Sequence, residues 1–155
     1  TVLGNNNLIM AYAHVGHDCV IGSNCVIVNN VSLAGEVVVG NFVVFGGHSG
    51  AHQFSHIGDH AMIAANTYVN KDVPPYVGAN FLGLRRRGFS NEDIKQIQDI
   101  FRVLFQDGHT YSAACDLVMA QFPESEIRNQ VVEFIRSSKR GILKPYNRAA
   151  VAADE

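Results

Sequence analysis

Apolar residues recur at every sixth position along the first half of the chain. Twelve consecutive positions of this series are apolar, and eleven of them are large: Leu3, Ile9, Val15, Ile21, Ile27, Leu33, Val39, Phe45, Ala51, Ile57, Ile63 and Val69. A period of six fits neither the turn of an α-helix nor the two-residue alternation of a strand. It is typical of a parallel β-helix, in which three short strands form one triangular coil of about 18 residues. The twelve hexads therefore predict a solenoid of four coils over residues 1–73.

Within each hexad, the position of a residue predicts its environment. The large apolar residue is expected to point inward and to stack on its equivalent in the next coil, about 4.7–4.9 Å away. The residue after it is often glycine, which suits a tight corner where unusual backbone angles or crowding exclude a bulky side chain. The fourth residue after it is small or β-branched. Cys19 and Cys25 occupy this place, and we interpret both as core residues.

The repeat is expected to end at Pro74 and Pro75, because consecutive prolines cannot continue a strand ladder. Residues 74–90 are then predicted to be a linker, residues 91–143 a small helical domain, and residues 144–155 a loose tail without periodic pattern.

Three helices are predicted in the second domain. Ser90 and Asp93 form the sequence signature of a capping box, and Gly108 follows the end of the helix that it opens. Further helices are expected at about residues 112–122 and 124–138. The expected buried positions of the three helices are Ile94, Ile97, Phe101, Leu104, Phe105, Ala114, Leu117, Val118, Ile127, Val131, Phe134 and Ile135.

Composition and charge exclude several classes of function. The net charge of −2 argues against a nucleic-acid binder that depends on a strongly basic surface. No apolar run reaches the roughly 18 to 20 residues of a membrane span, and no signal peptide opens the chain. Three cysteines suggest no disulfide framework and fit a reducing, cytoplasmic compartment. Eleven of the twelve basic residues lie in the second half, since only Lys71 precedes position 83.

Polar residues gather on one predicted face of the solenoid. Positions 18 apart stack in successive coils, which places His17, Gly35, Gln53 and Lys71 in one column. Asp18, Glu36, Phe54 and Asp72 form the column beside it, and His14 and His52 flank both.

The pair His17 and Asp18 has the composition of a general base with a carboxylate that orients it. Ordinary solvated corner residues are the alternative. His14 and His17 also raise the question of a metal site. A spacing of three on a coil of hexads need not bring two imidazoles together, and no third ligand is evident, so no metal is predicted.

Several strings resemble the UDP-N-acetylglucosamine acyltransferase family of lipid A synthesis: NLIMAYAHVGHDCVIGSNCVIVNNVSLAGEV, AHQF, DVPPYV and GLRRRGFS. The resemblance covers nearly the whole chain. It implies a left-handed β-helix that assembles as a homotrimer with active sites between subunits. It also implies transfer of a 3-hydroxyacyl chain from acyl carrier protein to the 3-hydroxyl of UDP-N-acetylglucosamine, without a cofactor.

The resemblance implies a catalytic role for three residues of the polar columns. The family's general base falls on His17, which would take the proton of the attacking hydroxyl while Asp18 orients its ring. The backbone N–H of Gly35 would stabilise the oxyanion.

The resemblance also implies substrate contacts. Five residues align with such positions: His14, His52 and Gln53 for the sugar and the acyl chain, and Asn80 and Arg86 for the nucleotide. Ala65 aligns with the residue that closes the end of the acyl groove, so it is expected to set the preferred chain length.

The chain also departs from the family pattern. Glu36 stands where the family commonly has histidine, and Leu82 where some relatives have a carboxylate. The stretch between Tyr76 and Asn80 is about ten residues shorter than the family pattern. The repeat opens at Thr1 without an initiator methionine, so amino-terminal coils of the family are expected to be missing.

Two other functions stay open. One is a related UDP-sugar N-acyltransferase of the same pathway, which uses a similar histidine in a β-helix. The other is an inactive, truncated module that only forms trimers.

Overall fold

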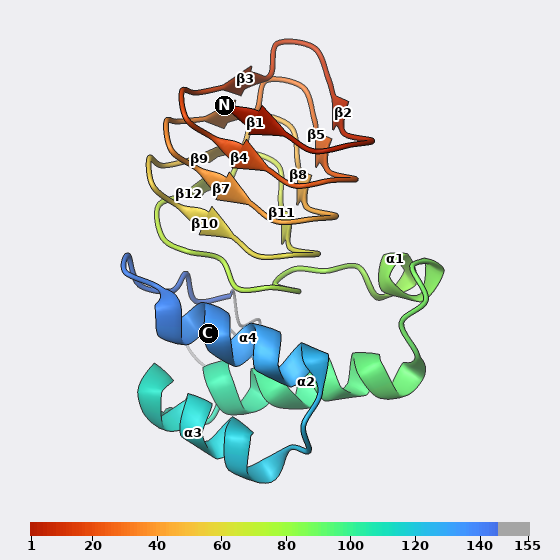
Figure 1. The fold of residues 1–155 in the computed structure, drawn as a ribbon, viewed down its shortest axis with the longest axis vertical. Coiled ribbons are helices and arrows are strands. Elements are labelled where there is room, and N and C mark those ends of the chain that lie inside the picture. The colour runs from red at the N-terminus through yellow and green to blue at the C-terminus, as the bar shows by residue number, and fades with distance from the viewer. Residues whose placement is uncertain (146–155) are drawn as a thin grey trace, which may run out of the picture.

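The first half of the protein is a triangular solenoid of four coils, and the second half is a group of helices below it (Figure 1). The structure, a computed structural model, describes residues 1–145. Each coil contributes one two-residue strand to each of three parallel sheets. The front sheet contains β1 (Val2–Leu3), β4 (Val20–Ile21), β7 (Val38–Val39) and β10 (His56–Ile57). The second contains β2 (Leu8–Ile9), β5 (Val26–Ile27), β8 (Val44–Phe45) and β11 (Met62–Ile63). The third contains β3 (His14–Val15), β6 (Ser32–Leu33), β9 (Gly50–Ala51) and β12 (Tyr68–Val69).

The register of the sheets confirms the predicted 18-residue coil. Val2 pairs with Val20, and Val20 pairs with Val38. In Figure 1 the strands of the front sheet run from left to right while the chain descends and passes to the rear on the right, which is a left-handed winding. The expected four-coil, left-handed solenoid is therefore confirmed.

The interior of the solenoid is apolar, as the hexads predicted. Ile27, Leu33 and Phe45 are fully buried. Cys19 and Cys25 are also fully buried, and their Sγ atoms lie 3.0 and 3.1 Å from the carbonyl oxygens of Ala34 and Gly40. The two thiols therefore belong to the core, as expected.

The corners use a different backbone position from the one that the sequence suggested. The third residue after each inward residue, and not the glycine directly after it, adopts the left-handed conformation, with φ between 57° and 66° from Asn6 to Asn66. The glycines are needed for space. A Cβ on Gly16, for example, would lie 2.7 Å from backbone atoms of Ala34 and Gly35 in the coil below. Crowding between coils therefore explains the glycines.

The ladder continues past the two prolines. The N–H of Gly58 donates to the Val73 carbonyl at 2.8 Å, and the N–H of Met62 donates to the Val77 carbonyl at 2.9 Å. Proline lacks an N–H group, but the carbonyls of this segment still accept hydrogen bonds from the coil above, so proline is tolerated here. Residues 73–77 therefore form a last rung, four residues beyond the end predicted at position 73.

Four helices follow the solenoid within residues 1–145. α1 (Phe81–Arg86) lies within the stretch predicted as a linker. α2 (Asn91–Phe105) begins with the predicted capping box of Ser90 and Asp93. α3 (Tyr111–Gln121) and α4 (Glu126–Ser137) start within two residues of the predicted positions, because Thr110 and Ser125 cap them.

The helices share a second hydrophobic core. Among the predicted positions, Leu117, Phe101, Phe105 and Phe134 are only partly buried. Ile100, Val103, Cys115 and Val132 are buried in addition. A helix packed between neighbours buries a wider face than its simplest periodic pattern indicates. No helix within residues 1–145 has the length and apolar character that crossing a membrane requires.

The segment after α4 returns to the end of the solenoid. Asp72 pairs with Ile142, and its N–H donates to the Gly141 carbonyl at 2.9 Å. The buried Asp72 carboxylate accepts hydrogen bonds from the Ser138 hydroxyl at 2.6 Å and from the His56 N–H at 2.8 Å. Of the tail predicted at residues 144–155, residues 146–155 lie outside the described part.

Candidate functional site

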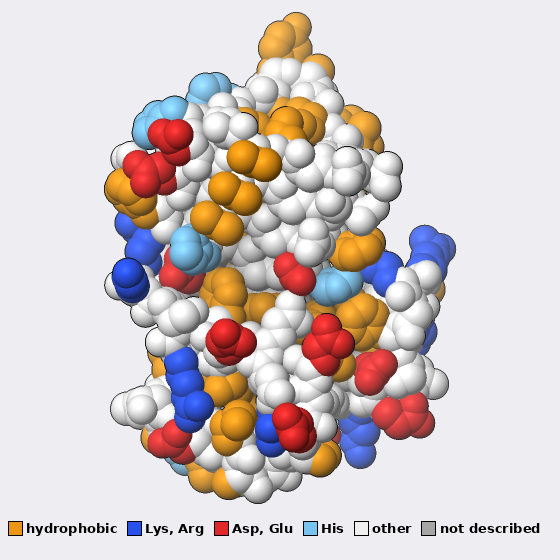
Figure 2. Space-filling model, viewed as in Figure 1, with side chains coloured by type: hydrophobic (Ala, Val, Ile, Leu, Met, Phe, Trp, Pro, Cys, Tyr) orange, Lys and Arg blue, Asp and Glu red, His pale blue; other side chains and the backbone are white. Residues whose placement is uncertain are grey.

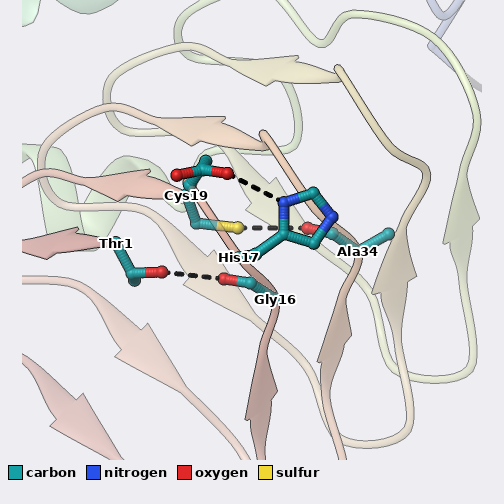
Figure 3. Close-up of polar contacts among 6 residues, drawn as sticks. Thr1, Gly16, His17, Cys19 and Ala34 are labelled. Carbon is teal, nitrogen blue, oxygen red and sulfur yellow. Dashed lines mark hydrogen bonds and ion pairs between the residues drawn. The ribbon is translucent and has the colours of Figure 1, made fainter.

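The corner that follows β3 carries the predicted base and carboxylate. His17 Nδ1 lies 3.0 Å from the Asp18 carboxylate, and both side chains are exposed (Figure 3). The hydrogen bond from His17 holds the pKa of Asp18 below its ordinary value. A carboxylate only accepts, so Nδ1 carries the proton in this pair and Nε2 keeps a lone pair. His17 is therefore arranged to accept a proton at Nε2.

Gly35 lies directly below this imidazole, in the next coil. A Cβ on Gly35 would collide with the His17 ring, approaching its Cε1 to 2.5 Å and its Cδ2 to 2.9 Å. The Glu36 N–H donates to the His17 carbonyl at 2.8 Å, which holds the two coils together at this corner. Within residues 1–145 the Gly35 N–H itself donates to no acceptor. The corner thus combines a free N–H with a proton acceptor.

The lower part of the column contains His52 and Gln53. His52 Nδ1 lies 3.0 Å from the Gln53 carbonyl oxygen and 3.1 Å from Nη2 of Arg140. The Tyr68 ring lies edge-on to His52, with 6.4 Å between centroids. His14, on β3, is exposed above them. The structure therefore brings the predicted residues of the coil onto one face.

The predicted nucleotide residues lie elsewhere in the same chain. Asn80 caps α1, where its side-chain oxygen accepts from the Leu82 N–H at 3.0 Å, and Arg86 is exposed in the last turn. Figure 1 places α1 at the right, at about mid-height, whereas the corner between β3 and β4 is at the upper left. Ala65 is exposed in the turn between β11 and β12, at another corner. One chain alone does not bring these residues to His17.

Within the described residues no three side chains of histidine, cysteine, aspartate or glutamate converge as a metal site would require. The three cysteines, Cys19, Cys25 and Cys115, are buried and unpaired.

The sequence did not reveal a second cluster, between the solenoid and the helices. His60 stacks between Phe42 and Tyr76, with centroid distances of 5.0 and 5.4 Å, and Phe89 lies edge-on at 5.0 Å. Arg87 Nη1 lies 3.1 Å from His60 Nδ1, and the guanidinium lies 5.3 Å from the Phe42 ring. Burial, and then the charge of Arg87, lower the pKa of His60, and the nearby carboxylate of Asp59 opposes this in part. A neutral His60 therefore joins α1 to the coil.

We expect acidification to weaken this junction. The folded-state pKa of His60 lies below its ordinary value of 6.5, so the unfolded chain binds a proton that the folded chain resists. The stability contributed by neutral His60 is then complete above pH 6.5 and is lost as the pH falls through its folded-state pKa. Urea unfolding at about pH 7.5 and about pH 5 should show a smaller decrease in His60→Phe than in wild type. An equal decrease in both proteins would contradict the assignment.

The solenoid and its polar corner define the class of the protein, a hexapeptide-repeat β-helix of the transferase type. Residues 1–35 match the bacterial transferase hexapeptide family, and residues 68–143 match the family described as UDP-N-acetylglucosamine O-acyltransferase, domain 2. The chain belongs to the UDP-N-acetylglucosamine O-acyltransferase family.

Individual relatives agree with this result. The chain is 44% identical to the acyl-(acyl-carrier-protein)–UDP-N-acetylglucosamine O-acyltransferase of Pseudomonas entomophila, over 93% of this chain and 60% of that protein. The UDP-N-acetylglucosamine acyltransferase structure from Francisella novicida superposes with a TM-score of 0.88 at 40% identity, over 97% of this chain and 59% of that one. The structure from Bacteroides fragilis also gives 0.88, at 39% identity, over 90% of this chain and 59% of that one. The chain thus spans about 60% of the length of the curated relatives that it matches.

Proposed function

We propose that this chain forms the catalytic part of an acyltransferase that moves a 3-hydroxyacyl group from acyl carrier protein to the 3-hydroxyl of UDP-N-acetylglucosamine, the first step of lipid A synthesis. One observation carries the proposal: the His17 imidazole, oriented by Asp18, packs against Gly35, whose N–H donates to no acceptor within residues 1–145. Attack of a hydroxyl on a thioester requires a proton acceptor and an N–H donor for the oxyanion, and this corner carries both.

The proposed reaction uses these groups in sequence. The sugar hydroxyl oxygen bonds to the thioester carbonyl carbon while its proton passes to His17 Nε2. The Gly35 N–H stabilises the negative charge that develops on the carbonyl oxygen. The carbon–sulfur bond then breaks, and the proton moves from His17 to the carrier thiolate. Asp18 stabilises the imidazolium between these two transfers.

The test is an acyl-transfer assay on the full-length protein. Hydroxyacyl carrier protein and UDP-N-acetylglucosamine should give an ester product and a free carrier thiol. If an amino sugar nucleotide is acylated instead, the related N-acyltransferase is correct. If a folded full-length protein transfers nothing to either acceptor, the trimer-forming module is correct.

The carrier protein is expected to bind the second half of the chain. Basic residues that lie there and can meet an acidic carrier are Arg85, Arg86, Arg87, Lys95, Arg102, Arg128 and Arg136. Arg128 is buried among helix carbonyls and Arg136 pairs with Asp116, so the exposed arginines of α1 are the strongest candidates of this group. This chemistry, together with the unpaired cysteines, supports a cytoplasmic location.

We further propose a homotrimer, which explains why Asn80 and Arg86 lie away from His17 in one chain: a neighbouring subunit would supply them. The front sheet offers a surface for such contact. Its outward residues Val2, Val20 and Val38 are 61%, 45% and 37% exposed and form an apolar stripe across the solenoid (Figure 2). Exposed apolar stripes of this kind mark protein interfaces.

A charge on this stripe is expected to weaken the trimer. Val38→Lys should lower the mass measured by light scattering at micromolar concentration, because a buried unpaired ammonium opposes association. Met119→Lys is the control, since Met119 on α3 is exposed to a similar extent, 38%, and lies far from the stripe. A monomeric wild type would contradict the trimer, and an unchanged mass for Val38→Lys would exclude this face.

Ala65 is proposed to limit the length of the acyl chain. Ala65→Met should shift the preferred donor to distinctly shorter chains, because the larger side chain fills the end of the groove. Each methylene contributes about 0.8 kcal/mol of burial, so neighbouring lengths should differ several-fold in kcat/KM. Ala11→Met is a matched control, because Ala11 occupies the same corner position three coils away and is also exposed. An unchanged optimum in an active Ala65→Met enzyme would remove Ala65 from the groove.

A further inference from the structure

An arginine from the far end of the described chain reaches the polar face of the solenoid. Arg140 follows α4, and its Nη2 lies 3.1 Å from His52 Nδ1 and 3.1 Å from the Asn70 carbonyl oxygen. His52 and Arg140 are 88 residues apart in the sequence. This contact belongs to none of the roles derived above.

The segment that carries Arg140 is anchored on both sides. The Ser138 hydroxyl donates to the buried Asp72 carboxylate at 2.6 Å. Gly141 accepts from the Asp72 N–H at 2.9 Å, and the Leu143 N–H donates to the Asp72 carbonyl at 2.8 Å. Arg140 is therefore held at a defined place beside β12 and not on a free tail.

Stability alone does not explain an arginine at this place. Its Nε is buried and has no hydrogen-bond partner within residues 1–145, which is an unfavourable arrangement for a donor. The hydrogen bonds of its side chain run through Nη2, to His52 and to Asn70. His52 is therefore the titratable side chain that Arg140 contacts within residues 1–145.

The chemistry of the two partners determines where the proton of His52 lies. A guanidinium has only donors, so an imidazole nitrogen that meets it must accept. His52 Nδ1 then carries no proton, and the ring proton of the neutral imidazole is on Nε2. The Gln53 carbonyl, 3.0 Å from the same Nδ1, requires the opposite, because a carbonyl oxygen only accepts. The two contacts exclude each other, and the bond from the charged group is the stronger one.

We propose that Arg140 is a positioning residue that holds His52 in the tautomer with its proton on Nε2, so that His52 presents an N–H donor on the polar face. Resting on the proposed function, this makes His52 a hydrogen-bond donor to an oxygen of the acyl donor or sugar. Without Arg140, Nδ1–H would turn to the Gln53 carbonyl, and Nε2 would become an acceptor.

Nitrogen NMR of the full-length protein tests the proposal directly. With the histidine ring nitrogens labelled, two-bond proton–nitrogen correlations distinguish the two tautomers, and His52→Gln identifies the signal of His52. Wild type should show Nε2–H. Arg140→Met, which keeps much of the length of the side chain but has no donor, should show a shift toward Nδ1–H. Lys139→Met is the matched control. The Lys139 side chain makes no polar contact within residues 1–145, so this variant should resemble wild type.

Kinetics provide the second measurement. Loss of one hydrogen-bond donor to the substrate should raise KM about 3- to 10-fold in Arg140→Met, with kcat nearly unchanged. Arg140→Lys keeps a cationic donor and should recover part of the loss. A KM unchanged in Arg140→Met would overturn the link to substrate binding.

The NMR result separates this inference from the proposed function. An Nδ1–H tautomer in wild type, or an unchanged tautomer in Arg140→Met, overturns the positioning role even if the enzyme is active. An Nε2–H tautomer that Arg140→Met abolishes supports the role even if no acyl transfer is found, and in that case the proposed function alone fails.

Discussion

Replacing His17 by alanine in the full-length protein is expected to lower the turnover of acyl transfer by about 100-fold or more, while the protein stays folded. Removal of a general base typically has an effect of this size. His17 is exposed at a corner, and its side chain contacts Asp18 rather than the core, so its loss should leave the stability of the solenoid nearly unchanged.

The matched control for this variant is His109→Ala. His109 is exposed in the loop between α2 and α3, away from the solenoid, and its replacement should keep wild-type turnover. Near-normal turnover of a folded His17→Ala protein would show that another group takes the proton.

Gly35→Ala is expected to have a comparable effect on turnover and little effect on stability. The added Cβ would collide with the His17 ring and not with backbone, and a side chain can rotate away. The displaced imidazole would no longer lie against Gly35. Because the backbone N–H remains and the positioned base is lost, the effect should match the usual contribution of a general base, and turnover should fall by about 100-fold. The melting temperature should change by only a few degrees.

Two glycines of the solenoid make this prediction specific. A Cβ on Gly47 would meet its nearest atoms at 3.5 and 3.6 Å, which is ordinary van der Waals contact, so Gly47→Ala should be active and stable. A Cβ on Gly16 would meet backbone of the next coil at 2.7 Å, so Gly16→Ala should instead unfold at a lower temperature. Full activity of Gly35→Ala would exclude the close approach of His17 and Gly35 during the reaction.

The solenoid and its register follow from the hexad pattern alone. Strand residues of successive coils pair with those 18 positions later, so a local pattern of six repeats the same environment from coil to coil. Val20 pairs with Val38 as the pattern requires. The same regularity is sufficient to place His17 above Gly35, because the two residues are 18 positions apart. The start of α2 was predictable for a similar reason, because the side chains of Ser90 and Asp93 bond to backbone groups only three residues away.

Other features depended on backbone details that a hexad pattern does not contain. The pattern located the corners but not the residue with positive φ, because several residue types, including Phe42 and Glu36, occupy that position. The prolines suggested the end of the ladder, but a last rung that accepts hydrogen bonds tolerates them. In both cases the hydrogen bonds of neighbouring coils decided the outcome.

Tertiary packing determines which residues of the second half reach the solenoid. Arg87 meets His60 and Arg140 meets His52 across 27 and 88 residues of sequence, and no period relates these positions. The meeting depends on how α1 turns back beside Phe42, and on how the segment after α4 pairs with Asp72. These contacts depend on how separate elements pack together. The repeat therefore predicts the coil, but it does not predict which side chains surround its polar face.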